Sequence, residues 1–174
     1  SFVENYVKKG DDFMSAGYYD TALICLNGHV INSRMKKYPQ HNTKFCQDCG
    51  AECINKCPHC NEDIRGEYHL ERVIARSFYV APSYCDKCGK PFPWLEEKLI
   101  ALDEIIDLMD ELSESEKRDL KQSARDVTTE NPRTSLAALK IKKFSLKVGS
   151  EIYNAVKNIL VQIAVEAAKK QIGL

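Results

Sequence analysis

The feature that most constrains this chain is a series of four short motifs that carry seven of its eight cysteines. In chain order they are Cys25-x-x-x-His29, Cys46-x-x-Cys49, Cys57-x-x-Cys60 and Cys85-x-x-Cys88. Each motif places two soft donor atoms on one tight turn, and tetrahedral sets of four Cys or His ligands are typical of structural zinc. Four pairs are enough for two such sets. The sequence therefore predicts two structural zinc ions per chain.

The sequence leaves open two ways of sharing the four motifs between the ions. Sequential pairing gives one set of Cys25, His29, Cys46 and Cys49 and a second set of Cys57, Cys60, Cys85 and Cys88. Interleaved pairing would combine the first motif with the third and the second with the fourth. We expect sequential pairing, because each unit of turn, hairpin and turn is then complete in itself.

Three further side chains compete for a ligand role. His29 is preferred over His41 for the first set, because its short loop carries Gly28 beside the turn. His41 and His59 are interpreted as exposed loop residues. Cys53 lies between two motifs, and we expect a small buried apolar side chain there. The alternative roles for Cys53 are a substitute ligand and a redox thiol.

The cysteines also bear on the compartment. Eight cysteines could form four disulfides in a secreted protein, but the paired spacing suits metal and nothing resembles a signal peptide. Reduced thiols then predict a cytoplasmic protein. No apolar run reaches the roughly 18 to 20 residues that span a bilayer. The cysteine region is short and polar, so we expect metal to supply folding energy that a small core cannot.

The fold class predicted is α+β, with two small zinc ribbons followed by a helical domain. Its parts are an N-terminal arm or extension (1–17), a tandem zinc-ribbon domain (18–92) and a helical domain (93–174). Strands are expected at 18–24, 30–35, 67–74 and 76–80, where β-branched and aromatic residues gather between turn signals.

The helical domain is predicted from the 3.6-residue spacing of apolar residues. Three or four helices are expected, covering 94–112, 113–127 and 135–172, the last interrupted at Gly149-Ser150. Pro93 suits a first helical position and Ser113-x-x-Glu116 is a capping-box pattern. The run from Ile159 to Val165 is apolar nearly all the way round. We therefore expect it to be buried on several sides, in a bundle or a dimer interface.

Charge is balanced overall but unevenly placed, with 25 basic and 25 acidic residues. Residues 96–130 carry five basic and twelve acidic residues, whereas residues 131–174 carry eight and two. The simplest interpretation is that these halves pack against each other or against a second copy. A basic surface for an anionic partner is the alternative.

Two other functions leave partial signals. Basic and aromatic side chains that lie close together in the ribbon sequence could contact nucleic acid, the basic ones through phosphates and the aromatic ones by stacking on bases. The basic residues are Arg34, Lys36, Lys37, Lys44, Arg72 and Arg76, and the aromatic residues are Tyr38, Phe78 and Tyr79. Zinc deaminases use H-x-E before P-C-x-x-C, and His69-Leu-Glu71 precedes Cys85-x-x-Cys88. However, Pro82 is not adjacent to Cys85, and the third motif would lose its partners.

The stretches Ile24–Asn32, Phe45–Gly50 and Cys57–Cys60 resemble a family of bacterial proteins with tandem zinc ribbons, domain of unknown function 2321. The resemblance extends from Tyr18 to the C-terminus and includes Arg133-Thr-Ser-Leu136. It implies bacterial origin and zinc ribbons, and it supplies no activity. We expect a non-enzymatic interaction or adaptor protein that binds a partner or a second copy through its C-terminal helices. A nucleic-acid-binding regulator and a zinc-dependent enzyme are the alternatives.

Overall fold

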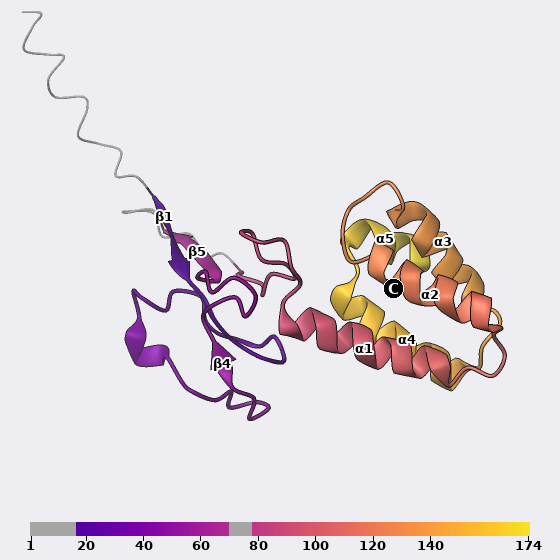
Figure 1. Ribbon diagram of the computed structural model, residues 1–174, viewed down its shortest axis with the longest axis horizontal. Helices are drawn as coiled ribbons and strands as arrows, with labels where there is room; N and C mark the ends of the chain where they lie inside the picture. Colours follow the sequence, from indigo (N-terminus) through magenta and orange to yellow (C-terminus); the bar gives the residue numbers. More distant parts are fainter. Residues whose placement is uncertain (1–16, 70–77) are drawn as a thin grey trace, which may run out of the picture. The chain divides into compact units, whose positions relative to one another are not determined.

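The computed structural model describes residues 17–69 and 78–174, which form two compact units divided between Phe92 and Pro93 (Figure 1). We call them the ribbon unit and the helical unit. Small antiparallel sheets lie in the first and helices in the second, so the predicted α+β class is confirmed. Residues 1–16 of the predicted arm, and residues 70–77 at the meeting of two predicted strands, lie outside the described residues.

The described residues of the ribbon unit form two small antiparallel sheets. Strand β1 pairs with β5, and β2 lies between β3 and β4. Their bounds are β1 Tyr18–Thr21, β2 Leu23–Cys25, β3 Val30–Asn32, β4 Cys53–Ile54 and β5 Arg65–His69, with a 3-10 turn at Pro39–His41. Strand β5 therefore pairs with a strand that precedes the first motif, and the prediction of two self-contained hairpin units was wrong in this respect.

The single strand predicted at 18–24 is divided at Ala22 between the two sheets. The strand is divided because a buried carboxylate takes part in the local hydrogen bonding. The Asp20 carboxylate is buried and accepts hydrogen bonds from the backbone N–H groups of Thr21, Lys36 and Lys37. The backbone N–H of Ala22 donates instead to the Ile64 carbonyl, at 2.9 Å. The chain thus changes partner at the point where a side chain takes over the local hydrogen bonding.

Strand β3 ends at Asn32, three residues before the predicted end, for a similar reason. Asn32 Nδ2 donates to the Tyr38 carbonyl, and its Oδ1 accepts from the Arg34 backbone N–H. Nearby, Gly66 on β5 lets two backbones approach closely, because a Cβ there would lie 2.3 Å from the Ser33 carbonyl oxygen.

The helical unit contains five helices within the described residues. They are α1 Pro93–Asp107, α2 Glu114–Asp126, α3 Thr134–Phe144, α4 Ser150–Ile163 and α5 Glu166–Ile172. Helix α1 packs on α2 and α4, and α3 packs on α2 and α5 (Figure 1). Leu102, Ile106, Val127 and Leu160 are among the fully buried residues of the core.

The break in the last predicted helix between α4 and α5 was not predicted. Ala164 adopts extended backbone, and the Val165 N–H donates to the Val127 carbonyl at the end of α2. That tertiary hydrogen bond ends α4 and starts α5 without any Gly or Pro. The prediction that Ile159–Val165 is buried on several sides holds in part, because Leu160, Ile163 and Ala164 are buried whereas Val161 is 41% exposed.

The start of α2 follows the predicted capping box. Ser113 Oγ accepts from the Glu116 backbone N–H, and the Glu116 carboxylate accepts from the Ser113 N–H. Ion pairs also join the acidic and basic halves of the unit, between Lys140 and Asp119, Arg133 and Asp126, and Lys147 and Glu116. Packing of these halves against each other, one of the two arrangements expected, is therefore present within a single chain.

None of the helices across residues 17–69 and 78–174 combines the length and the apolar character that a membrane crossing requires.

Candidate metal centres

Two groups of side chains in the described residues are arranged to hold a metal ion. The first consists of Cys25, His29, Cys46 and Cys49, and the second of Cys57, Cys60, Cys85 and Cys88. Within each group all the potential ligand atoms lie within 4.8 Å of one another. The grouping is the sequential one, and each group brings together two motifs that are distant in the sequence.

The distances within the groups match those of a tetrahedral zinc site. Sulfur atoms are 3.8 Å apart for Cys25 and Cys49, 3.8 Å for Cys57 and Cys88, and 3.7 Å for Cys60 and Cys85. Ligands at a Zn–S distance of about 2.3 Å would place the sulfurs of a tetrahedron about 3.8 Å apart. A disulfide would bring them to about 2.05 Å, and all eight cysteines are free thiols. The donor set and its spacing thus fit zinc.

Three of the four motifs share one backbone design. The N–H of the first cysteine donates to a carbonyl five residues later, at Ala51, Glu62 and Lys90 respectively. The residue after the second cysteine donates its N–H back to the carbonyl of the first cysteine, at 2.8 to 2.9 Å. An isolated antiparallel bridge closes each turn, at Phe45–Glu52, Lys56–Asp63 and Tyr84–Pro91. The repetition fixes both sulfurs of each pair on the same side of the turn.

The design needs a left-handed residue directly after the second cysteine. Gly50 and Gly89 provide it with φ of +71°, and Asn61 provides it in the third motif with φ of +61°. Asparagine is one of the few residues other than glycine that adopt this conformation readily. The sequence analysis did not single out Asn61, although its position directly after Cys60 is a signal for this conformation.

The first motif is built differently, on a hairpin turn between β2 and β3. The Cys25 N–H donates to the His29 carbonyl at 3.0 Å, and the His29 N–H donates to Cys25 Sγ at 3.3 Å. His29 Nδ1 lies 3.5 Å from Cys46 Sγ, so Nδ1 is the ring nitrogen that faces the group. The loop between the two ligands is one residue longer than in a C-x-x-C pair, and its second ligand is the His29 ring nitrogen in place of a cysteine sulfur.

In both groups the first member of each pair is buried, and the second is exposed or half-buried. Cys25, Cys46, Cys57 and Cys85 form the inner side of the groups, and His29, Cys49, Cys60 and Cys88 form the outer side. Four protein ligands are present in each group, which is the number that a closed structural site uses.

Ionisation of the thiols is strongly uneven. A backbone hydrogen bond from Ala51 lowers the pKa of Cys49 to about 6. Burial raises the pKa of Cys85, but backbone hydrogen bonds from Cys88 and Lys87 lower this pKa by a larger amount, and the net result is a pKa of about 7. A backbone hydrogen bond from Glu62 lowers the pKa of Cys60, yet burial and the neighbouring sulfurs raise it by more, to about 12. Thiolates this close oppose one another's ionisation, and a bound cation removes that opposition.

The other candidate ligands lie outside both groups. Cys53 is half-buried on β4, opposite Cys25 in the strand register, and burial raises the pKa of its thiol. His41 and His59 are exposed, as predicted.

Most of the cations proposed for nucleic acid are engaged within the ribbon unit. Arg34 forms a bidentate ion pair with Glu67, and Lys36 pairs with Asp63 at 2.7 Å. Lys37 Nζ lies 3.0 Å from His69 Nε2, and Lys44 lies over the Phe45 ring. Phe78 is almost fully exposed, whereas Tyr79 donates to the Arg65 carbonyl. Arg72 and Arg76 lie outside the described residues.

The deaminase set is not assembled in the part of the chain that the structure describes. His69 ends β5 with its ring against Tyr18, and Glu71 lies outside the described residues. Cys85 and Cys88 lie with Cys57 and Cys60 instead.

A pair of Cys/His metal-binding ribbons ahead of a five-helix unit is thus the class of protein that this geometry defines. The chain belongs to the bacterial family described as "Uncharacterized protein conserved in bacteria" (DUF2321), which matches residues 18–172. This confirms the resemblance inferred from the motifs. No curated protein and no solved structure gives a significant match to the chain.

Proposed function

We propose that this protein is a zinc-binding, non-enzymatic interaction protein. Two structural zinc ions hold the ribbon unit in shape, and the C-terminal helices bind a partner protein or a second copy. The observation that carries the proposal is the spacing of 3.7 to 3.8 Å between facing sulfurs in two four-ligand groups. One zinc is assigned to Cys25, His29, Cys46 and Cys49, and the other to Cys57, Cys60, Cys85 and Cys88.

A structural role follows from the number and type of ligands. Catalytic zinc keeps one position open for water or substrate, whereas each group here offers four protein ligands. The ribbon unit also needs the ions for stability. Its strands are two to five residues long, and Ile24, Ile64 and Phe92 are its largest fully buried side chains. So small a core does not offset the entropy of ordering the chain without metal.

The helical unit supplies the proposed interaction surface. Leu136 and Leu139 lie one turn apart on α3 and are 52% and 59% exposed. Residues three apart on a helix share a face, so these side chains form a small apolar patch that a partner helix can cover. The cytoplasm suits the protein, because reduced thiols are required for both zinc sites.

The metal assignment is tested by replacing zinc with cobalt in the full chain. Two Co²⁺ ions per chain, with the visible bands of tetrahedral thiolate coordination, are the expected result. One ion, or bands of octahedral coordination, would contradict two closed sites.

The interaction surface is tested by sedimentation of the wild type and of the Leu136→Glu/Leu139→Glu variant. Self-association that the variant loses would support pairing of two copies through α3. A Leu108→Glu variant is the matched control, because Leu108 is 74% exposed at the end of α1. Equal effects of the two variants would contradict a role for the α3 patch.

A further inference from the structure

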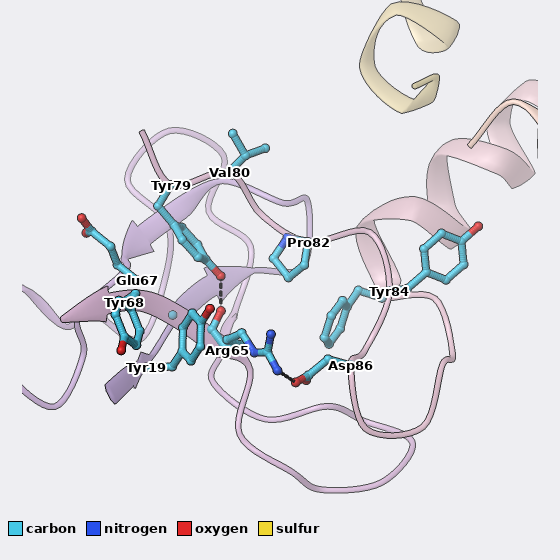
Figure 2. A pocket seen from close by; sticks show the side chains of 11 residues that line it. Tyr19, Arg65, Glu67, Tyr68, Tyr79, Val80, Pro82, Tyr84 and Asp86 are labelled. Carbon is cyan, nitrogen blue, oxygen red and sulfur yellow. Dashed lines mark hydrogen bonds and ion pairs between the residues drawn. The ribbon is translucent and has the colours of Figure 1, made fainter. Parts of the chain in front are cut away.

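A cavity of about 460 Å³ lies in the ribbon unit beside the second metal group. Figure 2 shows strands β1 and β5 on one side and the segment that leads to the last C-x-x-C pair on the other. Asp86, inside that pair, also lines the cavity. The cavity is therefore shaped by the same turn that carries Cys85 and Cys88, and its volume is in the usual range for a binding pocket.

The cavity is unusually rich in aromatic rings. Four of the chain's eight tyrosines line it, together with Phe92. Tyr19 and Tyr68 face each other across β1 and β5 with ring centroids 4.8 Å apart, yet they remain 55% and 45% exposed. Tyr79 is fixed above β5 by its hydroxyl, which donates to the Arg65 carbonyl at 2.5 Å (Figure 2). The rings are thus held in place while part of their surface stays accessible.

The charged groups of the cavity are paired with each other or with neighbours. The Arg65 guanidinium lies over the Tyr19 ring and forms an ion pair with Asp86 at 2.5 Å. Glu67 is held by Arg34 at 2.6 Å. A charged ligand would have to displace one of these partners. A neutral, flat aromatic group can stack on the tyrosines and keep both ion pairs intact.

The charges beside the cavity decide between a nucleobase and an aromatic amino acid. The adjoining polar hollow is lined by Lys36, Lys87 and Arg65, but also by Asp20, Asp63 and Asp86. Single-stranded nucleic acid needs an excess of cations along its phosphates in addition to stacking rings. Here the carboxylates equal the cations in number, which favours a protein side chain.

We propose that this cavity binds an aromatic side chain, tryptophan or tyrosine, of a partner protein. The inference rests on the proposed interaction function and assigns a second contact site, on the ribbon unit. Buried aromatic anchors in pockets rich in Tyr and Arg carry a large share of the binding energy at protein interfaces. The Arg65–Asp86 ion pair would set the edge of the pocket and orient the inserted ring.

The test uses the zinc-loaded full chain, labelled with ¹⁵N, and N-acetyl-tryptophanamide as the probe in an NMR titration. The expected result is saturable shifts confined to the backbone amides around the cavity, at Tyr19, residues 65–68, residues 79–86 and Phe92. Tyr19→Ala should weaken this binding about tenfold, which corresponds to about 1.4 kcal/mol. Tyr18→Ala is the matched control. Tyr18 is the neighbouring residue, is similarly exposed and does not line the cavity, so its loss should change binding less than about twofold.

Three outcomes would overturn the proposal. They are the absence of saturable shifts at the cavity, equal effects of the Tyr18→Ala and Tyr19→Ala variants, and stronger, salt-sensitive binding of an oligothymidine at the same amides. The zinc content of each sample is measured by native mass spectrometry. A result of two zinc ions without probe binding would refute the cavity proposal alone, whereas loss of zinc from the wild type would refute the proposed function.

Discussion

The ribbon unit and the helical unit are of similar length but are stabilised in different ways. The ribbon unit has short strands, a few large buried side chains and two groups of metal ligands. The helical unit has five helices around a continuous apolar core, with Leu102, Ile106 and Val127 completely buried. Under the proposed function, a metal ion bound by four ligands fixes the chain segments of the ribbon unit, whereas side-chain packing fixes those of the helical unit.

This difference predicts which substitutions destabilise each unit most. Removing one ligand from a four-ligand site affects every segment that the ion ties together, although the residue itself is small. Removing a buried side chain from the helical unit leaves a cavity whose cost depends on its volume. The two units should therefore respond independently to metal removal and to core substitution.

The largest effect is expected from Cys57→Ser. It removes a ligand of the second group, so the chain should retain one zinc and lose folded structure around residues 57–69 and 78–92. Zinc supplies about 10 kcal/mol or more of folding free energy in small zinc-dependent domains. Native mass spectrometry and NMR would check both results. Cys53→Ser is the control, since Cys53 belongs to neither group, and loss of zinc from that variant would contradict the ligand assignment.

Leu102→Ala should destabilise the helical unit by about 2 to 5 kcal/mol, because Leu102 is fully buried between helices. Zinc content should stay at two ions. Thermal unfolding followed by far-UV circular dichroism measures the change. Ile100→Ala on the same helix, at a residue 50% exposed, should cost much less. A loss of zinc from Leu102→Ala would show that the two units are not independent.

Asn61→Ala should weaken zinc binding at the second group about tenfold, because a residue with Cβ and no polar side chain disfavours the left-handed backbone by about 1 to 2 kcal/mol. Asn61→Gly should bind zinc as well as the wild type, since glycine accepts the observed φ of +61°. Competition with a chelator of known affinity compares the three proteins. Equal weakening by both substitutions would point to the asparagine side chain rather than the backbone.

The smallest effect concerns the pH dependence of the helical unit. Lys147, and next the Ser113 N–H and hydroxyl, lower the pKa of Glu116 to about 2. A carboxyl group whose pKa is depressed by folding contributes stability above its unfolded pKa of about 4.3, and this contribution disappears as the pH falls towards 2. Glu116→Gln should therefore melt at a lower temperature than the wild type at pH 7, and the difference should shrink as the pH falls through 2. A difference that does not shrink between pH 5 and pH 2 would contradict this origin.

The sequence predicted the parts of the structure that local spacing determines. The spacing within each motif identified the ligand pairs, and Ser113 and Glu116 identified the start of α2. In each case the residues that interact, or the residues that shape the turn, lie a few positions apart. Local stereochemistry is then sufficient for the prediction.

The parts that were missed depend on contacts between distant residues. Asp20 divides the first strand because the backbone of Lys36 and Lys37 reaches its carboxylate. The break before α5 depends on a hydrogen bond from Val165 to Val127. The aromatic cavity combines strands β1 and β5 with the segment after residue 78. None of these pairings has a signal in the spacing of neighbouring residues.

The most direct test of the central claim is stepwise removal of metal from the full chain, followed by native mass spectrometry and ¹⁵N NMR on the same samples. The account predicts two zinc ions per chain at the start. As a chelator removes them, the amide signals of residues 17–69 and 78–92 should collapse while those of the helical unit keep their dispersion. A ribbon unit that stays folded without zinc, or a protein purified with fewer than two ions that reloading with zinc does not restore, would contradict it.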